Sequence, residues 1–173
     1  MTTQVKNITR EYLLEILETV KDPEVPVLSI MDLGIVRNLE WVYVSDEKGY
    51  WKILITPTYS GCPAMDMITM QIRMTLFSHG IHAFDIQTVL SPAWTTDWMT
   101  ESGKQKLFEY GIAPPHPLPG HYMGTTHIDS EPVVCPHCNS THTHRISEFG
   151  STACKALYQC DECREPFDYF KCH

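Results

Sequence analysis

Residues 56–63 read TPTYSGCP and join two segments of different character. The run from Trp51 to Ile55 alternates in polarity, which predicts a strand, and residues 64–79 have the amphipathic spacing of a helix. Pro63 suits the first helical position, where an N–H group would have no partner. We therefore expect Cys62 at or beside the helix N-cap, where free N–H groups and the helix dipole favour a thiolate. Since a thiolate attacks electrophiles and binds metals, Cys62 is a candidate functional residue, and the alternative is a small, half-buried turn residue.

The elements on either side of this segment predict a small mixed domain. Thr9 is placed to cap a helix that runs to about Val20, and residues 35–44 and 50–56 alternate like two antiparallel strands. A third strand is expected over residues 84–90, followed by a helix that starts at Thr96 or Asp97 and ends at Gly111. The order α-β-β-α-β-α predicts a two-layer α+β domain over residues 1–111.

The helix after Pro63 is rich in methionine. Its apolar stripe includes Met67, and Met65, Met70 and Met74 widen it. A methionine-rich face sometimes binds partners, but core packing is the interpretation that the pattern favours.

Two further groups of residues are candidate sites. Asp22, Glu24 and Asp32 lie within eleven positions of one another in a proline-containing segment. Carboxylates in such segments bind turn N–H groups, and the alternative is a metal or partner contact. Trp94 follows the third strand, as the Cys62 loop follows the second, and strand ends in α/β layers gather ligand-facing groups. The alternative for Trp94 is that it covers the edge of the core.

Composition limits the class of protein. The 173 residues include 43% hydrophobic and 20% charged residues, which is typical of a globular chain. There are 13 basic and 21 acidic side chains, a net charge of −8, so nucleic-acid binding is not expected. No apolar run approaches the ~18 residues of a membrane span, and the N-terminus lacks a secretory apolar segment. These features predict a cytoplasmic protein that does not enter a membrane.

The C-terminal part predicts a metal site. Residues 112–131 are rich in proline and predict an extended linker, in which the histidines have no ligand spacing. Residues 132–173 contain two Cys-x-x-Cys pairs, and their four thiolates suit a tetrahedral zinc site in a small ribbon, with the ligands Cys135, Cys138, Cys160 and Cys163. Iron would occupy the same four sulfurs, and Cys154 and Cys172 are additional thiols without an assigned role.

The segment from Asp22 to Val36, together with residues 56–63, resembles the MIP18 (DUF59) family of iron–sulfur assembly proteins. The resemblance covers roughly residues 8–110 and implies a role in maturing metalloproteins, with Cys62 as the motif cysteine and Asp22 and Glu24 as the acidic turn. The chain departs from many members of that family by carrying the ribbon.

The whole chain also resembles the family of D-type subunits of bacterial phenylacetyl-CoA epoxidase systems. The matching segments are residues 91–98, 111–115 and 160–167. This resemblance implies an accessory protein of phenylacetate catabolism that does not turn over substrate. Its implied clients are di-iron oxygenase subunits and an iron–sulfur flavin reductase.

The leading hypothesis is therefore a maturation factor with a structural zinc ion. Cys62 would hold iron or an iron–sulfur cluster transiently, or contact the client, and Asp22, Glu24 and Asp32 would orient the loop or add ligands. Because one thiol cannot hold a cluster alone, a homodimer or client ligands would complete the site. The alternatives are a purely structural component of the oxygenase and an acyl-transfer enzyme that uses Cys62 as nucleophile.

Overall fold

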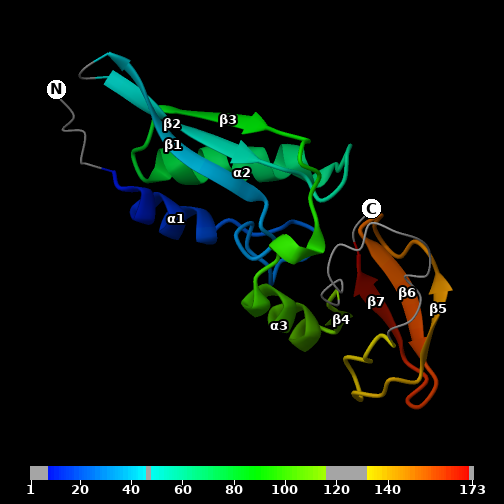
Figure 1. Cartoon of the computed structure of the whole chain (residues 1–173). Helices are drawn as coiled ribbons and strands as arrows, with labels where there is room; N and C mark the ends of the chain where they lie inside the picture. The colour runs from blue at the N-terminus through cyan, green and yellow to red at the C-terminus, as the bar shows by residue number, and fades with distance from the viewer. Residues whose placement is uncertain (1–7, 46–47, 116–131, 172–173) are drawn as a thin grey trace. The chain divides into compact units, whose positions relative to one another are not determined.

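The computed structural model describes residues 8–45, 48–115 and 132–171 (Figure 1). The chain divides between Trp94 and Thr95 into two compact units. No helix within the described ranges has the length and apolar character needed to cross a membrane.

The first unit is a three-stranded sheet with two helices, α1 (Arg10–Glu18) and α2 (Ala64–Ser78), on one side of it (Figure 1). The strand order is β1 (Val36–Ser45), β2 (Lys48–Ile55) and β3 (Phe84–Thr88). Strand β2 pairs antiparallel with β1 and parallel with β3. The fully buried side chains that form the core between the helices and the sheet include Leu13, Leu17, Ile53, Ile55, Ile68, Ile72 and Leu76. The predicted α+β class is confirmed.

Local capping explains where α1 begins. The Thr9 side chain accepts a hydrogen bond from the Tyr12 N–H at 3.2 Å, as its N-cap position predicts. At α2 the N-cap is Pro63, and the helix begins at Ala64, so Cys62 lies beside the N-cap as expected. Gly80 follows this helix with φ +74°, a left-handed conformation that suits glycine.

The methionines of α2 differ from the expectation. Met65 is buried, but Met67, Met70 and Met74 are 51%, 58% and 60% exposed. The interpretation that all four pack in the core is therefore wrong for three of them. The buried residues of α2 are Ala64, Met65, Ile68, Ile72 and Leu76, and the helical period turns Met67, Met70 and Met74 away from this face.

The second unit contains the 3-10 turn η1 (Thr96–Trp98), the helix α3 (Glu101–Tyr110) and a four-stranded sheet. The sheet order is β4 (Ile112–Ala113), β7 (Pro166–Phe170), β6 (Lys155–Cys160) and β5 (Thr143–Ser147). Strand β4 pairs parallel with β7, whereas β6 pairs antiparallel with both β5 and β7.

Two expectations about this unit need correction. The last helix does not start at Thr96 or Asp97, because Thr100 is its N-cap and accepts a hydrogen bond from the Gly103 N–H at 2.9 Å. The linker does not start at residue 112, because residues 112–113 form β4. The second compact unit includes α3 together with the ribbon, whereas the predicted domain boundary follows residue 111. The rest of the predicted linker, residues 116–131, lies outside the described residues, with its three histidines.

Candidate functional site

Each Cys-x-x-Cys pair of the ribbon forms a tight backbone loop. The Asn139 N–H donates to the Cys135 carbonyl at 2.9 Å, and the Arg164 N–H donates to the Cys160 carbonyl at 3.1 Å. Both donors have a positive φ, 62° at Asn139 and 65° at Arg164. Few non-glycine residues adopt this conformation, so its repetition directly after the second cysteine of each pair shows two copies of one knuckle.

The two knuckles bring four sulfurs together. All four Sγ atoms lie within 4.8 Å of one another, with 3.5 Å between Cys138 and Cys160 and 3.8 Å between Cys135 and Cys163. A zinc–sulfur bond of about 2.3 Å places the sulfurs of a regular tetrahedron about 3.8 Å apart. The set therefore has the ligand type, number and approximate spacing of a structural zinc site. Cys135 and Cys160 are fully buried beside Val133, Ala113 and Phe167.

Cys160 and Cys163 have very different pKa values because their surroundings differ. N–H groups of Cys163 and Glu162 donate to the Cys160 sulfur and lower the pKa of Cys160 to about 6. At Cys163 the Glu165 N–H lowers the pKa, but burial and the neighbouring thiols outweigh it and raise the value to about 12. One thiolate thus forms readily and opposes ionisation of its neighbours, as expected of like charges in contact. A dication removes this opposition, because metal binding deprotonates all four thiols.

The additional cysteines do not extend the ligand set. Cys154 is buried, and its Sγ lies 3.1 Å from the Thr152 hydroxyl oxygen. It belongs to no group of potential ligands in residues 8–45, 48–115 and 132–171. Cys172 lies outside the described residues.

In the first unit, three loops meet at one edge of the sheet. Because β2 and β3 are parallel and β1 is antiparallel to β2, the segment before β1 and the segments after β2 and β3 share this edge. Backbone hydrogen bonds tie them together, from the Thr56 N–H to the Ile35 carbonyl and from the Val89 N–H to the Ile55 carbonyl, both at 2.9 Å. The buried Trp94 adds a third link, since its Nε1–H donates to the Leu33 carbonyl at 2.8 Å.

Cys62 lies on one of these loops. Its side chain is half-buried, its N–H donates to the Tyr59 carbonyl at 3.2 Å, and its carbonyl accepts from the Met65 N–H at 3.2 Å. Gly61 precedes it with φ +83° and open space where a Cβ would stand. The sulfur is therefore held by an ordered turn and is not sealed inside the core.

The candidate acids have local partners. One oxygen of Asp22 accepts from the N–H groups of Glu24 and Val25, each at 2.8 Å. Asp32 accepts from the Ser29 N–H at 2.9 Å, and its own N–H donates to the Ser29 hydroxyl oxygen at 2.9 Å. These bonds are those of turn-capping residues. Across the described parts of the chain, the four-cysteine set is the one group arranged to hold an ion, and the acids do not form one with Cys62.

Sequence reasoning missed Ser29 as a central residue of this edge. Ser29 is fully buried, and its hydroxyl donates to the Glu18 carboxylate at 2.9 Å while it also caps Asp32. The signal was present as the spacing Ser29-x-x-Asp32, which is the spacing of a reciprocal cap. The roles of Cys62, Asp22, Glu24, Asp32 and Trp94 toward a metal or a client stay predictions.

Comparison with known proteins matches two parts of the chain to two different families. Residues 10–78 match the iron–sulfur cluster assembly protein family, and residues 120–171 match the PaaD zinc beta ribbon domain. A candidate D-type subunit of 1,2-phenylacetyl-CoA epoxidase from Escherichia coli is 52% identical over 91% of this chain and 89% of its own length. An Fe-S protein maturation auxiliary factor from Porphyromonas gingivalis is 33% identical over 57% of this chain and 90% of its own length.

A solved DUF59 domain from Bacillus anthracis aligns with a TM-score of 0.49 and 27% identity, over 56% of this chain and 89% of that chain. Two of the relatives, from Porphyromonas gingivalis and Bacillus subtilis, are named Fe-S protein maturation auxiliary factors, in agreement with the prediction of a non-catalytic accessory protein. The predicted zinc ribbon is confirmed by the family match and by the four clustered cysteines. The chain joins a region similar to the iron–sulfur cluster assembly protein family to a zinc ribbon, and it belongs to the family of the D-type 1,2-phenylacetyl-CoA epoxidase subunits.

Proposed function

We propose that this protein assists the maturation of metal centres in a phenylacetyl-CoA epoxidase system. The observation that carries the proposal is the 52% identity to the E. coli protein, which extends over both units. The second line of support is the similarity of residues 10–78 to iron–sulfur cluster assembly proteins. Its partners are therefore protein clients, namely di-iron oxygenase subunits and an iron–sulfur flavin reductase.

In this proposal Cys62 is the residue that binds the transferred iron or iron–sulfur cluster. Its half-buried sulfur stands on an ordered turn at the edge where three loops are hydrogen-bonded together, which keeps its position fixed. The cargo is iron or a transient iron–sulfur cluster, and the remaining ligands come from the client or from a second copy of the chain. Asp22 and Asp32 act by holding the turns, since their oxygens accept backbone N–H groups.

The ribbon has a separate task. Four thiolates saturate a tetrahedral zinc ion and leave no open position for a substrate, so the ion stabilises the fold rather than reacting. The ribbon then offers a rigid surface to the client.

A Cys62-dependent acyl transfer receives no support from the geometry. Such a nucleophile needs a base within hydrogen-bond reach. His79 is the C-cap of α2 and His82 follows it, whereas Cys62 precedes the fifteen-residue helix. The two ends of such a helix are about 22 Å apart.

The test is co-expression of the Cys62→Ser variant with the oxygenase and reductase proteins. Cys154→Ser is the matched control, because Cys154 is also outside the zinc set. We expect Cys62→Ser to lower the iron and acid-labile sulfide of the purified clients while its own zinc stays at one ion per chain. Full client iron with Cys62→Ser refutes the maturation role. If the clients then also fail to assemble, the protein is a structural component of the oxygenase.

A further inference from the structure

The helix α2 is apolar on two opposite faces. One face packs into the core through Ala64, Ile68, Ile72 and Leu76. The other face carries Met67, Met70, Met74 and Phe77, with exposed fractions of 51%, 58%, 60% and 48%. Steps of three, four and three residues keep these side chains on one line along the helix. We call these four residues the methionine stripe.

A helix that covers a sheet normally turns charged residues to the solvent. The stripe itself holds none, and α2 has one acid and one base, Asp66 and Arg73. Arg73 lies over the Phe84 ring at 5.9 Å, and Phe77 packs against the same ring at 5.3 Å. An outer face of this kind is typical of a helix that a partner covers.

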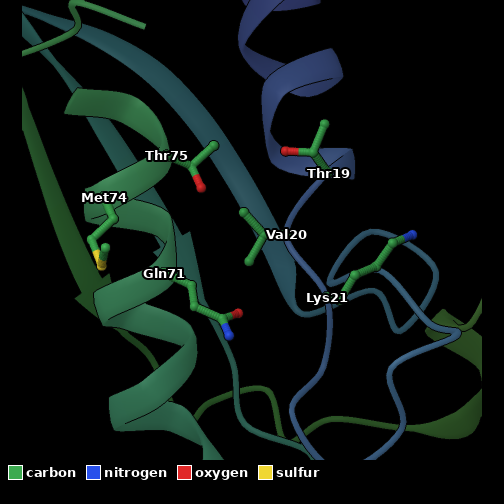
Figure 2. Close-up of a pocket in the computed structure, with 6 residues that line it drawn as sticks. All are labelled: Thr19, Val20, Lys21, Gln71, Met74 and Thr75. Atoms are coloured by element: carbon green, nitrogen blue, oxygen red, sulfur yellow. The ribbon is translucent and has the colours of Figure 1, made fainter. Parts of the chain in front are cut away.

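A small recess borders the stripe on the side toward α1. It measures about 320 Å³ and is lined by Thr19, Val20, Lys21, Gln71, Met74 and Thr75 (Figure 2). Met74 belongs to both the stripe and the recess. Figure 2 shows the Gln71 amide pointing from α2 into the space beside Val20. The Gln71 Oε1 is buried and has no hydrogen-bond partner among the described residues, so an acceptor is available to an incoming donor.

The far margin of the recess includes an acidic residue of α1. Tyr12 of α1 and its C-cap Thr19 mark the side toward α2, since the Tyr12 ring lies 6.4 Å from the His79 ring and Thr19 lines the recess. Glu15 is three residues after Tyr12 and four before Thr19, and therefore lies on that side of α1. Glu15 is exposed, but Lys21 also lines the recess, so the charge beside the stripe is mixed. The preference for a positively charged partner therefore comes from the net charge of −8 of the whole chain.

The area of the surface indicates the size of its occupant. Four half-exposed side chains offer on the order of 400 Å² of apolar surface. A stable dimer hides about 800 Å² on each partner, so a second copy of this chain would need a much larger surface. One amphipathic helix laid along α2 matches the available stripe.

We propose that the methionine stripe docks an amphipathic helix of a partner protein. The apolar face of that helix packs on the four side chains, and a flanking lysine or arginine residue faces Glu15. A donor side chain reaches Gln71 in the recess. Because methionine adapts its shape, the stripe accepts helices of differing sequence, as a protein with several clients requires. The inference does not depend on the role of Cys62.

The test uses two synthetic helical peptides of about 18 residues, or five turns. They share a leucine stripe and differ only in the flanking residues, which are lysine in one and glutamate in the other. Binding to the full chain is measured by fluorescence anisotropy. Oxidation by dilute hydrogen peroxide then reports the accessibility of each methionine. We expect the lysine peptide to bind, to lose affinity as salt rises, and to slow the oxidation of Met67, Met70 and Met74.

Variants locate the binding surface. Met70→Glu should weaken the lysine peptide by about tenfold or more, because it places a charge in the centre of the apolar contact. Leu90→Glu is the control, since Leu90 is 60% exposed and lies outside α2. Equal affinity of the two peptides, or unchanged affinity in Met70→Glu, overturns the proposal. Concentration-dependent protection of the same methionines in the free chain also overturns it and assigns the stripe to self-association.

Discussion

Replacing Trp94 by Phe removes the indole link between two of the loops at the Cys62 edge. The Trp94 Nε1–H donates to the Leu33 carbonyl at 2.8 Å, and the side chain is 3% exposed. Loss of the donor costs about 1–3 kcal/mol, because a buried carbonyl loses its partner. The smaller ring adds about 1 kcal/mol through the space it leaves. We therefore expect Trp94→Phe to lower the free energy of unfolding by about 2–4 kcal/mol.

Trp51→Phe is the matched control. Trp51 is 7% exposed and packs edge-on against Trp41, with ring centroids 5.6 Å apart. Its Nε1 is buried and has no partner in the described part of the chain. The same substitution therefore removes ring volume but no hydrogen bond. It should cost about 1 kcal/mol or less.

Urea unfolding followed by far-UV circular dichroism measures both variants against the unchanged protein. The difference between the two losses isolates the hydrogen bond, provided that the denaturant slopes agree. Equal destabilisation by the two substitutions would refute the reasoning, since it would mean that the indole contributes only its volume.

Three further outcomes follow from the geometry. Cys138→Ser removes one of four metal ligands, and we expect zinc affinity to fall by at least about a hundredfold in a chelator competition, with unfolding of β5–β7 in the metal-free protein. Asp22→Ala removes an acceptor of two backbone N–H groups and should lower the free energy of unfolding by about 1–3 kcal/mol in urea titrations. The His142 Nδ1–H donates to the Glu162 carboxylate at 2.8 Å, and this contact raises the pKa of His142, so an NMR titration should show its proton lost above the ordinary value of about 6.5.

Each of these predictions has its own control. Zinc binding should be unchanged in Cys154→Ser, and equal loss in both variants would count against the assigned ligand set. Asp22→Asn keeps one acceptor oxygen and should cost less than Asp22→Ala. Glu162→Gln should return the pKa of His142 toward its ordinary value. Any stabilisation from this pair is complete below that ordinary value and disappears as pH rises through the raised one.

Much of the architecture could be predicted because the patterns are strong. Alternating apolar residues indicate β1 and β2, Thr9 and Gly111 mark helix ends, and two Cys-x-x-Cys pairs indicate the zinc site. Other features depend on competition between near-equal local signals. Thr96, Asp97 and Thr100 all suit an N-cap, and only the folded chain selects Thr100 for α3.

The sequence also could not predict which face of α2 packs against the sheet. Apolar residues on both faces of a helix do not reveal which face the sheet will cover, so Met67, Met70 and Met74 could not be placed outside from their spacing. The backbone of Arg164 is another feature that the sequence does not predict. Arg164 and Asn139 are the two non-glycine residues with a positive φ in the described chain, and arginine has no preference for that conformation. The roles of the acids depend on which N–H groups the fold brings near them.

Strand β4 shows where a fragment of this protein should be cut. It is two residues long, yet it occupies the edge of the ribbon sheet beside β7. A fragment that stops at residue 111 carries α3 without the unit it belongs to, and β4 becomes the first two residues of the complementary fragment. Fraying at that new terminus would expose the β7 edge, which is then prone to pair with other chains. A cut after Trp94 instead keeps the hydrogen bond between the indole and the Leu33 carbonyl within the N-terminal fragment. The C-terminal fragment then keeps α3, the four-stranded sheet and the four-cysteine site together.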